Sequence, residues 1–150
     1  MALQESGGFK GELEIILRDK DGKIKERRIE RNLLVNTGLN AILDRLVGTS
    51  EAVMSHMALG SGTTAAAAGN TALVTQLGNR EAIDSSTVSG ASVSYASTFE
   101  NGDATGTVTE AGIFNASTSG TMLCRSVFSA ITKGANDSLS ITWTITVTAS

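Results

Sequence analysis

The end of the chain alternates between apolar and hydroxyl-bearing residues, and this pattern limits the possible folds more than any other. From residue 139 to residue 148 an apolar residue is always followed by Ser or Thr: Leu139, Ile141, Trp143, Ile145 and Val147 against Ser140, Thr142, Thr144, Thr146 and Thr148. A period of two residues is that of a half-buried β-strand. The segment therefore predicts a strand whose apolar row, including Trp143, faces a core.

The hydroxyl row of this strand has two interpretations, and the sequence leaves both open. In the first interpretation the row is a solvated outer face, on which Thr suits β structure. Alternatively it is a contact surface for another protein subunit, because the centres of protein interfaces are depleted of charged residues.

The N-terminal region is predicted to form a β-hairpin. In residues 9–18 three apolar side chains share one face: Leu13, Ile15 and Leu17. Residues 19–22 (DKDG) are typical of a turn, and residues 23–31 are predicted to return as a charged strand that discourages unwanted pairing. Ile24 and Ile29 lie five positions apart, so the alternation slips once, which indicates a β-bulge.

The rest of the chain predicts a mainly β protein with a β-sandwich or jelly-roll-like architecture. A short strand is predicted at 53–59, and four more fill the C-terminal half, at about 93–99, 108–114, 122–128 and 139–147. Short strands at intervals of roughly 10–15 residues are typical of such folds. Residues 85–92 are predicted to be a loop, as is the Gly- and Ala-rich stretch that begins at residue 60.

One amphipathic α-helix is predicted at about residues 37–47. Its apolar residues follow the helical spacing i, i+3, i+4, i+7: Leu39, Ile42, Leu43 and Leu46. Asn36 or Thr37 is expected to cap its start through a side-chain oxygen, and Gly48 sits where the helix should stop. A further single helical turn is predicted after Asn70.

Length and composition indicate one domain, residues 1–150, with an N-terminal hairpin arm (1–31) and a sandwich core carrying the helix (32–150). The 150 residues are 41% hydrophobic and 18% charged, with a net charge of −3. The acidic balance argues against nucleic-acid binding. No apolar run approaches the ~20 residues of a membrane span, and residues 1–8 do not have the pattern of a signal peptide. A single cysteine excludes an internal disulfide and fits assembly in a reducing cytosol.

Candidate chemistry is sparse, and we expect no enzymatic activity, cofactor, small-molecule substrate or metal. His56 is the only histidine, and it is expected to be a strand residue with a satisfied ring. Cys124 is expected to be buried as a small hydrophobic residue, with Arg125 on the opposite face. Residues 60–62 (GSG) lack the other elements of a phosphate or dinucleotide loop.

Glu110 lies in a predicted strand among small and apolar residues, which suggests an internal ion pair that organises the sheets. Arg80 and Arg125 are the candidate partners. A buried carboxylate needs such a partner because an isolated buried charge is unfavourable.

The order of several segments resembles a family of small virion structural proteins of tailed bacteriophages. The resemblance covers about residues 32–147 and rests on these segments: 32–39 (NLLVNTGL), 56–64 (HMALGSGTT), 70–73 (NTAL) with Arg80, 109–114 (TEAGIF), 120–125 (GTMLCR), Lys133 and 139–145 (LSITWTI). It implies one of two roles: a capsid decoration (cement) protein that stabilises the lattice of the major capsid protein, or a tail-fibre or baseplate module.

The chain has no long fibrous segment, which favours the decoration protein. The resemblance then implies a location on the capsid surface after assembly in the host bacterial cytoplasm, with the major capsid protein and copies of the chain itself, often three, as partners. A carbohydrate-binding sandwich is the competing class. It is disfavoured by the 4% aromatic content, because sugar sites present exposed rings.

Overall fold

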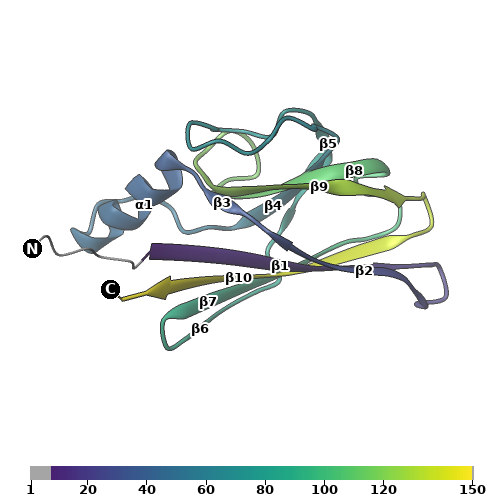
Figure 1. The fold of residues 1–150 in the computed structure, drawn as a ribbon, viewed down its shortest axis with the longest axis horizontal. Coiled ribbons are helices and arrows are strands. Elements are labelled where there is room, and N and C mark those ends of the chain that lie inside the picture. Colours follow the sequence, from purple (N-terminus) through teal and green to yellow (C-terminus); the bar gives the residue numbers. More distant parts are fainter. Residues whose placement is uncertain (1–7, 150) are drawn as a thin grey trace, which may run out of the picture.

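The computed structural model describes residues 8–149 and consists of two antiparallel five-stranded sheets that face each other, with one helix at one end (Figure 1). Sheet A has the strand order β2-β1-β10-β7-β6, and sheet B has the order β3-β9-β8-β4-β5. The strands and the helix have these bounds: β1 Gly8–Arg18, β2 Ile24–Arg31, β3 Leu33–Leu34, α1 Asn36–Leu46, β4 His56–Gly60, β5 Gln76–Ala82, β6 Ser85–Ser89, β7 Ser92–Phe99, β8 Gly106–Phe114, β9 Met122–Lys133 and β10 Ser138–Thr148. The predicted fold class, mainly β with a sandwich architecture and one helix, is confirmed.

The strand that best displays the alternation, β10, lies at the centre of sheet A between β1 and β7. Its apolar row points toward sheet B, and Trp143 is completely buried. The β1 row of Leu13, Ile15 and Leu17 joins the same core because Leu13 pairs with Trp143 and Ile15 with Ile141. The alternation thus predicted the buried face correctly.

The N-terminal hairpin is built into sheet A. β1 pairs with β10 along its whole length, from Gly8 opposite Thr148 to Arg18 opposite Ser138. The register between β1 and β2 shifts next to Arg18, which confirms the predicted bulge. Within the described residues the hairpin is therefore an integral part of the sandwich, and β2 forms its edge. Residues 1–7 of the predicted arm lie outside the described residues.

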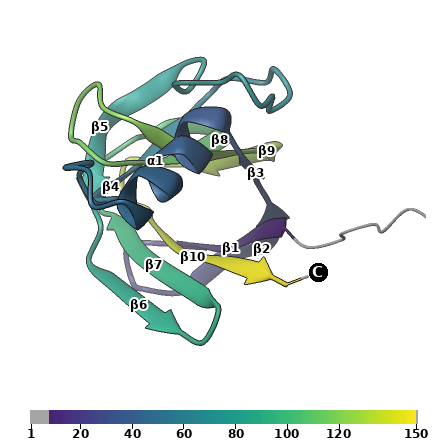
Figure 2. The same cartoon turned by 90° about the vertical axis from the view of Figure 1, so that its left-hand side faces the viewer.

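Sheet B is covered on both sides. In β8 every residue from Val108 to Phe114 is buried, because one face of the strand meets sheet A and the other lies beneath the segment 61–75. Figure 2 shows this segment on the side of sheet B that faces away from sheet A, while α1 lies across the end of the sandwich.

The helix is confirmed within one residue of its predicted bounds, but its cap and its buried face differ from the prediction. Val35 occupies the N-cap position without a side-chain hydrogen bond, while Thr37 Oγ1 donates to the carbonyl of Met122 in β9. Leu39 and Ile42 pack against the core, whereas Leu43 and Leu46 are exposed. The buried residues of the helix are Gly38 and Ala41, and Gly38 lies against Leu123 of β9. The buried face is therefore rotated away from Leu43 and Leu46.

Two local predictions are wrong. Residues 85–89, predicted to be a loop, form β6, which pairs with β7 from Ser85 opposite Ala96 to Ser89 opposite Ser92. No helical turn follows Asn70; the chain continues as a loop into β5. In β6 the backbone hydrogen bonds to β7 decide the conformation of a weakly patterned sequence. After Asn70 the chain is held as a loop instead, because the N–H groups of Val74 and Thr75 donate to the Glu110 side chain.

Arg28 of β2 connects the two sheets at their open side. Its guanidinium donates to the carbonyls of Ser129 and Ala130 in β9, at 3.1 Å each, and also pairs with Glu26 and Glu30. Part of the β9 edge is therefore occupied by a side chain of the opposite sheet.

Gly38 offers a test of how α1 packs. A Cβ at this position would overlap the backbone of Leu123, so only glycine allows the helix to approach β9 so closely. Alanine is a better helix former by about 1 kcal/mol, yet we expect Gly38→Ala to lower the free energy of unfolding by about 1–3 kcal/mol through overpacking. Urea unfolding of this variant and of Asn40→Ala, on the exposed side of α1, would measure the difference. Equal stability of the two variants would contradict the close packing.

Candidate functional site

The residues with the greatest potential for chemistry are engaged in structural contacts. His56 begins β4, and its Nδ1 lies 2.8 Å from Ser55 Oγ, which agrees with the expected satisfied ring. Cys124 is buried in the core, and burial raises the pKa of its thiol, which disfavours the reactive thiolate. Within residues 8–149 no three His, Cys, Asp or Glu residues gather in a way that could hold a metal ion.

Glu110 of β8 and Arg125 of β9 form the predicted internal ion pair. Both side chains are fully buried, and the guanidinium lies 2.9 Å from Glu110 Oε2. The other candidate, Arg80, has a different partner: its guanidinium stacks on the ring of Phe114 at 3.5 Å and donates to the carbonyls of Ala116 and Ser119. The sequence therefore indicated an ion pair of Glu110, and the register between β8 and β9 decided that its partner is Arg125.

The Glu110 carboxylate also fixes the two ends of the segment 61–75. It accepts hydrogen bonds from the backbone N–H groups of Gly62, Val74 and Thr75 at 2.8–3.0 Å. Burial disfavours the charged carboxylate, but these three N–H groups and Arg125 outweigh burial, so the pKa of Glu110 lies below its ordinary value. The carboxylate is thus held in its ionised form.

Arg125 holds the middle of the same segment. It donates to the carbonyl of Thr64 at 2.9 Å and to Asn70 Oδ1 at 3.0 Å, with a longer contact to the carbonyl of Ala65. The segment, predicted to be a flexible loop, is tied to a buried ion pair at several points. It presents small uncharged residues to solvent, namely Thr63, Thr64, Ala65, Ala67 and Ala68.

Gly62 shows why the start of this segment needs glycine. A Cβ at Gly62 would lie 2.5 Å from Glu110 Oε1 and 2.5 Å from the Val74 side chain. The GSG sequence at 60–62 thus provides room for a carboxylate and serves the fold.

The outer surface of sheet A is divided into two halves. Its uncharged half, which we call the hydroxyl face, comes from β6, β7 and β10: Ser85, Thr87, Ser89, Ser92, Ser94, Ala96, Thr98, Ser140, Thr142, Thr144 and Thr146. Two hydroxyl pairs are hydrogen-bonded across the strands, Ser92 with Thr146 at 2.7 Å and Ser94 with Thr144 at 2.9 Å. The other half, on β1 and β2, is charged and contains the Glu14–Arg27 ion pair.

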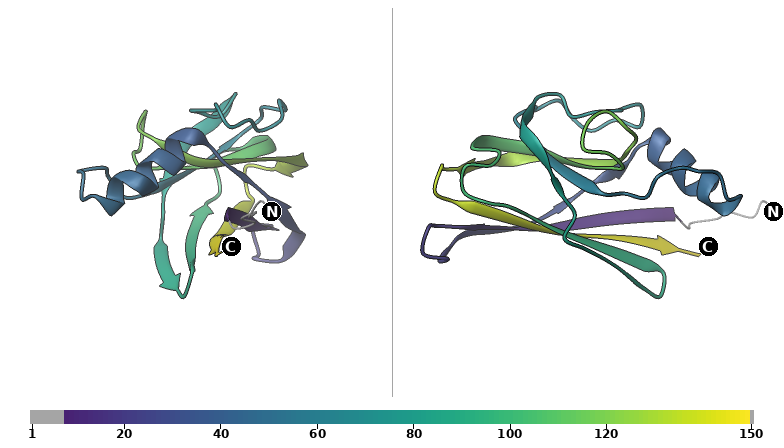
Figure 3. Two further views of the ribbon diagram at one scale, coloured as in Figure 1. Left: turned by 60° about the vertical axis from the view of Figure 1, so that its left-hand side comes forward. Right: turned by 180° about the vertical axis from the view of Figure 1, so that it is seen from behind.

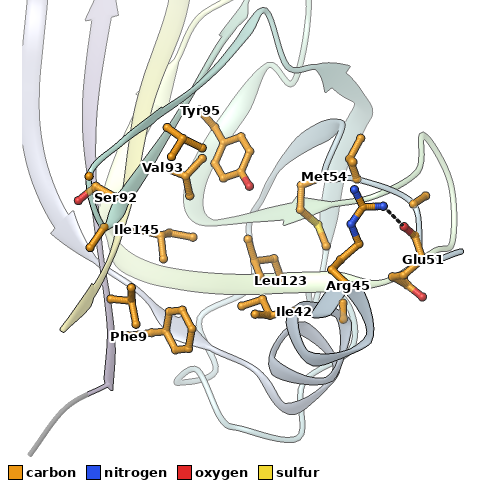
Figure 4. A pocket seen from close by; sticks show the side chains of 17 residues that line it. Phe9, Ile42, Arg45, Glu51, Met54, Ser92, Val93, Tyr95, Leu123 and Ile145 are labelled. Carbon is orange, nitrogen blue, oxygen red and sulfur yellow. Dashed lines mark hydrogen bonds between the residues drawn. The ribbon is translucent and has the colours of Figure 1, made fainter. Parts of the chain in front are cut away.

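An apolar groove of about 390 Å³, which no sequence pattern predicts, opens between α1 and sheet A. Figure 4 shows side chains of α1, β1, β7, β9 and β10 converging there, among them Phe9, Ile42, Tyr95, Leu123 and Ile145. At one end Arg45 donates to the backbone carbonyl of Glu51 at 3.1 Å. Six separate stretches of the chain build the groove, so no local pattern could have revealed it.

The comparisons with known proteins assign no family. No protein-family model, no curated protein and no solved structure matches the chain. Among the described residues, no helix has the length and apolar character needed to cross a membrane.

The buried pair is expected to be strongly coupled. Glu110→Gln or Arg125→Met leaves one charged group buried without its partner, and each should lower the free energy of unfolding by about 3–5 kcal/mol. The double variant removes both charges, so it should lose clearly less than the sum of the two single losses. Urea unfolding of the four proteins would give the coupling energy, and additive losses would show that the pair does not act as a unit.

The low pKa of Glu110 makes stability depend on pH in a defined direction. Since the folded-state pKa lies below the ordinary value of 4.5, the carboxylate contributes its full stabilisation above that value and loses it as the pH falls toward the folded-state pKa. We therefore expect the gap in unfolding free energy between wild type and Glu110→Gln to narrow as the pH falls below 4.5. Urea unfolding across this range measures it, and a constant gap would be inconsistent with ionised Glu110.

Proposed function

We propose that the chain is a non-enzymatic structural protein of a tailed-bacteriophage virion, and that it acts as a capsid decoration protein. Its partners are the major capsid protein and further copies of the chain, and its location is the capsid surface after assembly in the host cytoplasm. The order of segments between residues 32 and 147 suggests the family. The observation that carries the proposal is the hydroxyl face, a broad uncharged surface that lies beside the charged outer half of sheet A on β1 and β2.

The hydroxyl face suits docking to another protein for an energetic reason. Desolvating a charged side chain is costly, and the centres of protein interfaces are correspondingly depleted of charge. On this surface Ser94 and Thr144 already share a hydrogen bond, so their hydroxyls are partly satisfied before any partner arrives. The charged half on β1 and β2 would then form the rim.

The segment 61–75 offers a second neutral surface that is ordered in advance. Because Glu110 and Arg125 hold it from below, little conformational freedom would be lost when a partner binds it. Contacts that are weak in one copy add up across a symmetric lattice, where linked attachment can raise the net affinity by ~10²–10⁴.

The copy number in purified virions tests this role. Quantitative mass spectrometry against the major capsid protein should find hundreds of copies for a lattice protein, which is an order-of-magnitude expectation for a shell of repeated sites. A handful of copies would place the chain in the tail, as a fibre or baseplate adaptor. Its absence from virions would contradict both roles.

Ser94→Lys tests the surface itself, because it places a charge at the centre of the hydroxyl face. Particles assembled with this variant should lose most of their bound copies. A matched control is Ile29→Lys, which adds the same charge to the exposed β2 edge of the same sheet and should keep normal occupancy. Thermal unfolding would show whether both variants fold, and full occupancy with folded Ser94→Lys would rule out this docking face.

A further inference from the structure

The edge strand β6 lies at one end of sheet A and, in the part of the chain that the structure describes, pairs on one side only, with β7. All five of its residues are exposed, and Val88 is 76% exposed. Figure 3 shows the β6–β7 hairpin extending away from sheet B, with its outer side clear of the other described elements. Open strand edges are templates for pairing with another chain.

The two edges of sheet A are protected very differently. At the opposite edge, β2 (IKERRIER) is mostly charged, and its register is disturbed by a bulge. β6 (SSTVS) has neither a charged residue nor proline. Charges, bulges and prolines are the usual means of blocking an edge, and β6 uses none of them.

The backbone orientation of β6 follows from the hydrogen-bonding register. The N–H of Val147 donates to the carbonyl of Ala91, so the polar groups of the next residue, Ser92, face β6. Ser92 pairs with Ser89, and orientation alternates along an antiparallel strand. The N–H and C=O groups of Ser86 and Val88 therefore point outward, on either side of Thr87.

We propose that two copies of the chain pair antiparallel through β6, about a two-fold axis at Thr87. In this register Ser86 of each copy lies opposite Val88 of the other, so each outward N–H and C=O of these two residues meets a complementary group. The same patch serves both copies, as a closed two-fold contact requires. An uncharged edge pairs with itself without like-charge repulsion, which would be destabilising across strands.

The side chains support the same arrangement. The Val88 side chain lines the apolar groove on the inner side of the sheet, and in the pair the two Val88 side chains become diagonal neighbours across the strands. On the outer side the Thr87 side chains meet, so the hydroxyl faces of the two copies join into one surface. The pairing does not depend on the virion role.

Oligomeric state and amide protection together test the pairing. Sedimentation equilibrium of the wild type should show a monomer–dimer equilibrium, and hydrogen exchange at Ser86 and Val88 should slow as the dimer forms. Val88→Lys should raise the dissociation constant by tenfold or more, because it brings two like charges together at the axis. Ser86→Pro should do the same by removing an outward N–H, a change that edge strands tolerate.

The matched control is Leu46→Lys, which replaces another highly exposed apolar residue at the end of α1 and should leave the dimer unchanged. A wild-type monomer at all concentrations would overturn the proposal, and so would a trimer, such as the family resemblance implies. A dimer that persists in both folded β6 variants would equally overturn it.

Discussion

The buried ion pair between Glu110 and Arg125 is the interaction on which the outer layer of sheet B depends. The carboxylate is fully buried, yet it is surrounded by the guanidinium and three backbone N–H groups. Such a cluster is favourable only when every group is in place, because one missing partner leaves a charge without compensation. The position of the segment 61–75 is consequently coupled to the charge state of Glu110.

This constraint extends beyond the segment itself. Gly62 must remain small to leave room for the carboxylate, and the backbone N–H of Asn36, at the start of α1, donates to the carbonyl of Ala68. The helix therefore rests partly on the segment that the ion pair holds. One polar cluster thus links β8, β9, the segment and α1, while the apolar rows of β1 and β10 hold sheet A against sheet B.

Sheet A combines two surfaces with opposite properties. Its β2 edge is charged and bulged, whereas its β6 edge and the neighbouring hydroxyl face are neutral. A strand with mixed charges resists accidental pairing, and a neutral one accepts it. The proposals for capsid docking and for self-pairing both draw on this asymmetry: the first uses the face of the sheet and the second uses its edge.

Much of this organisation could be predicted from local pattern. The two-residue period placed Trp143 and Leu13 in the core, the slipped alternation located the β2 bulge, and the isolated carboxylate indicated an ion pair. The failures are also informative. Residues 85–89 carry no alternation because an exposed edge strand has no buried row, and the leucine spacing of α1 misplaced its buried face because close approach to β9 required Gly38 instead.

The sequence by itself determined which strands bury an apolar row and which residues are neutral, because side-chain direction along a strand depends only on the residue's position. The tertiary structure alone decided that Glu110 pairs with Arg125, that six stretches of the chain enclose the apolar groove, and that β6 is a free edge among residues 8–149. These features arise between residues far apart in the chain. They are fixed by the register and order of strands, and no local period encodes that information.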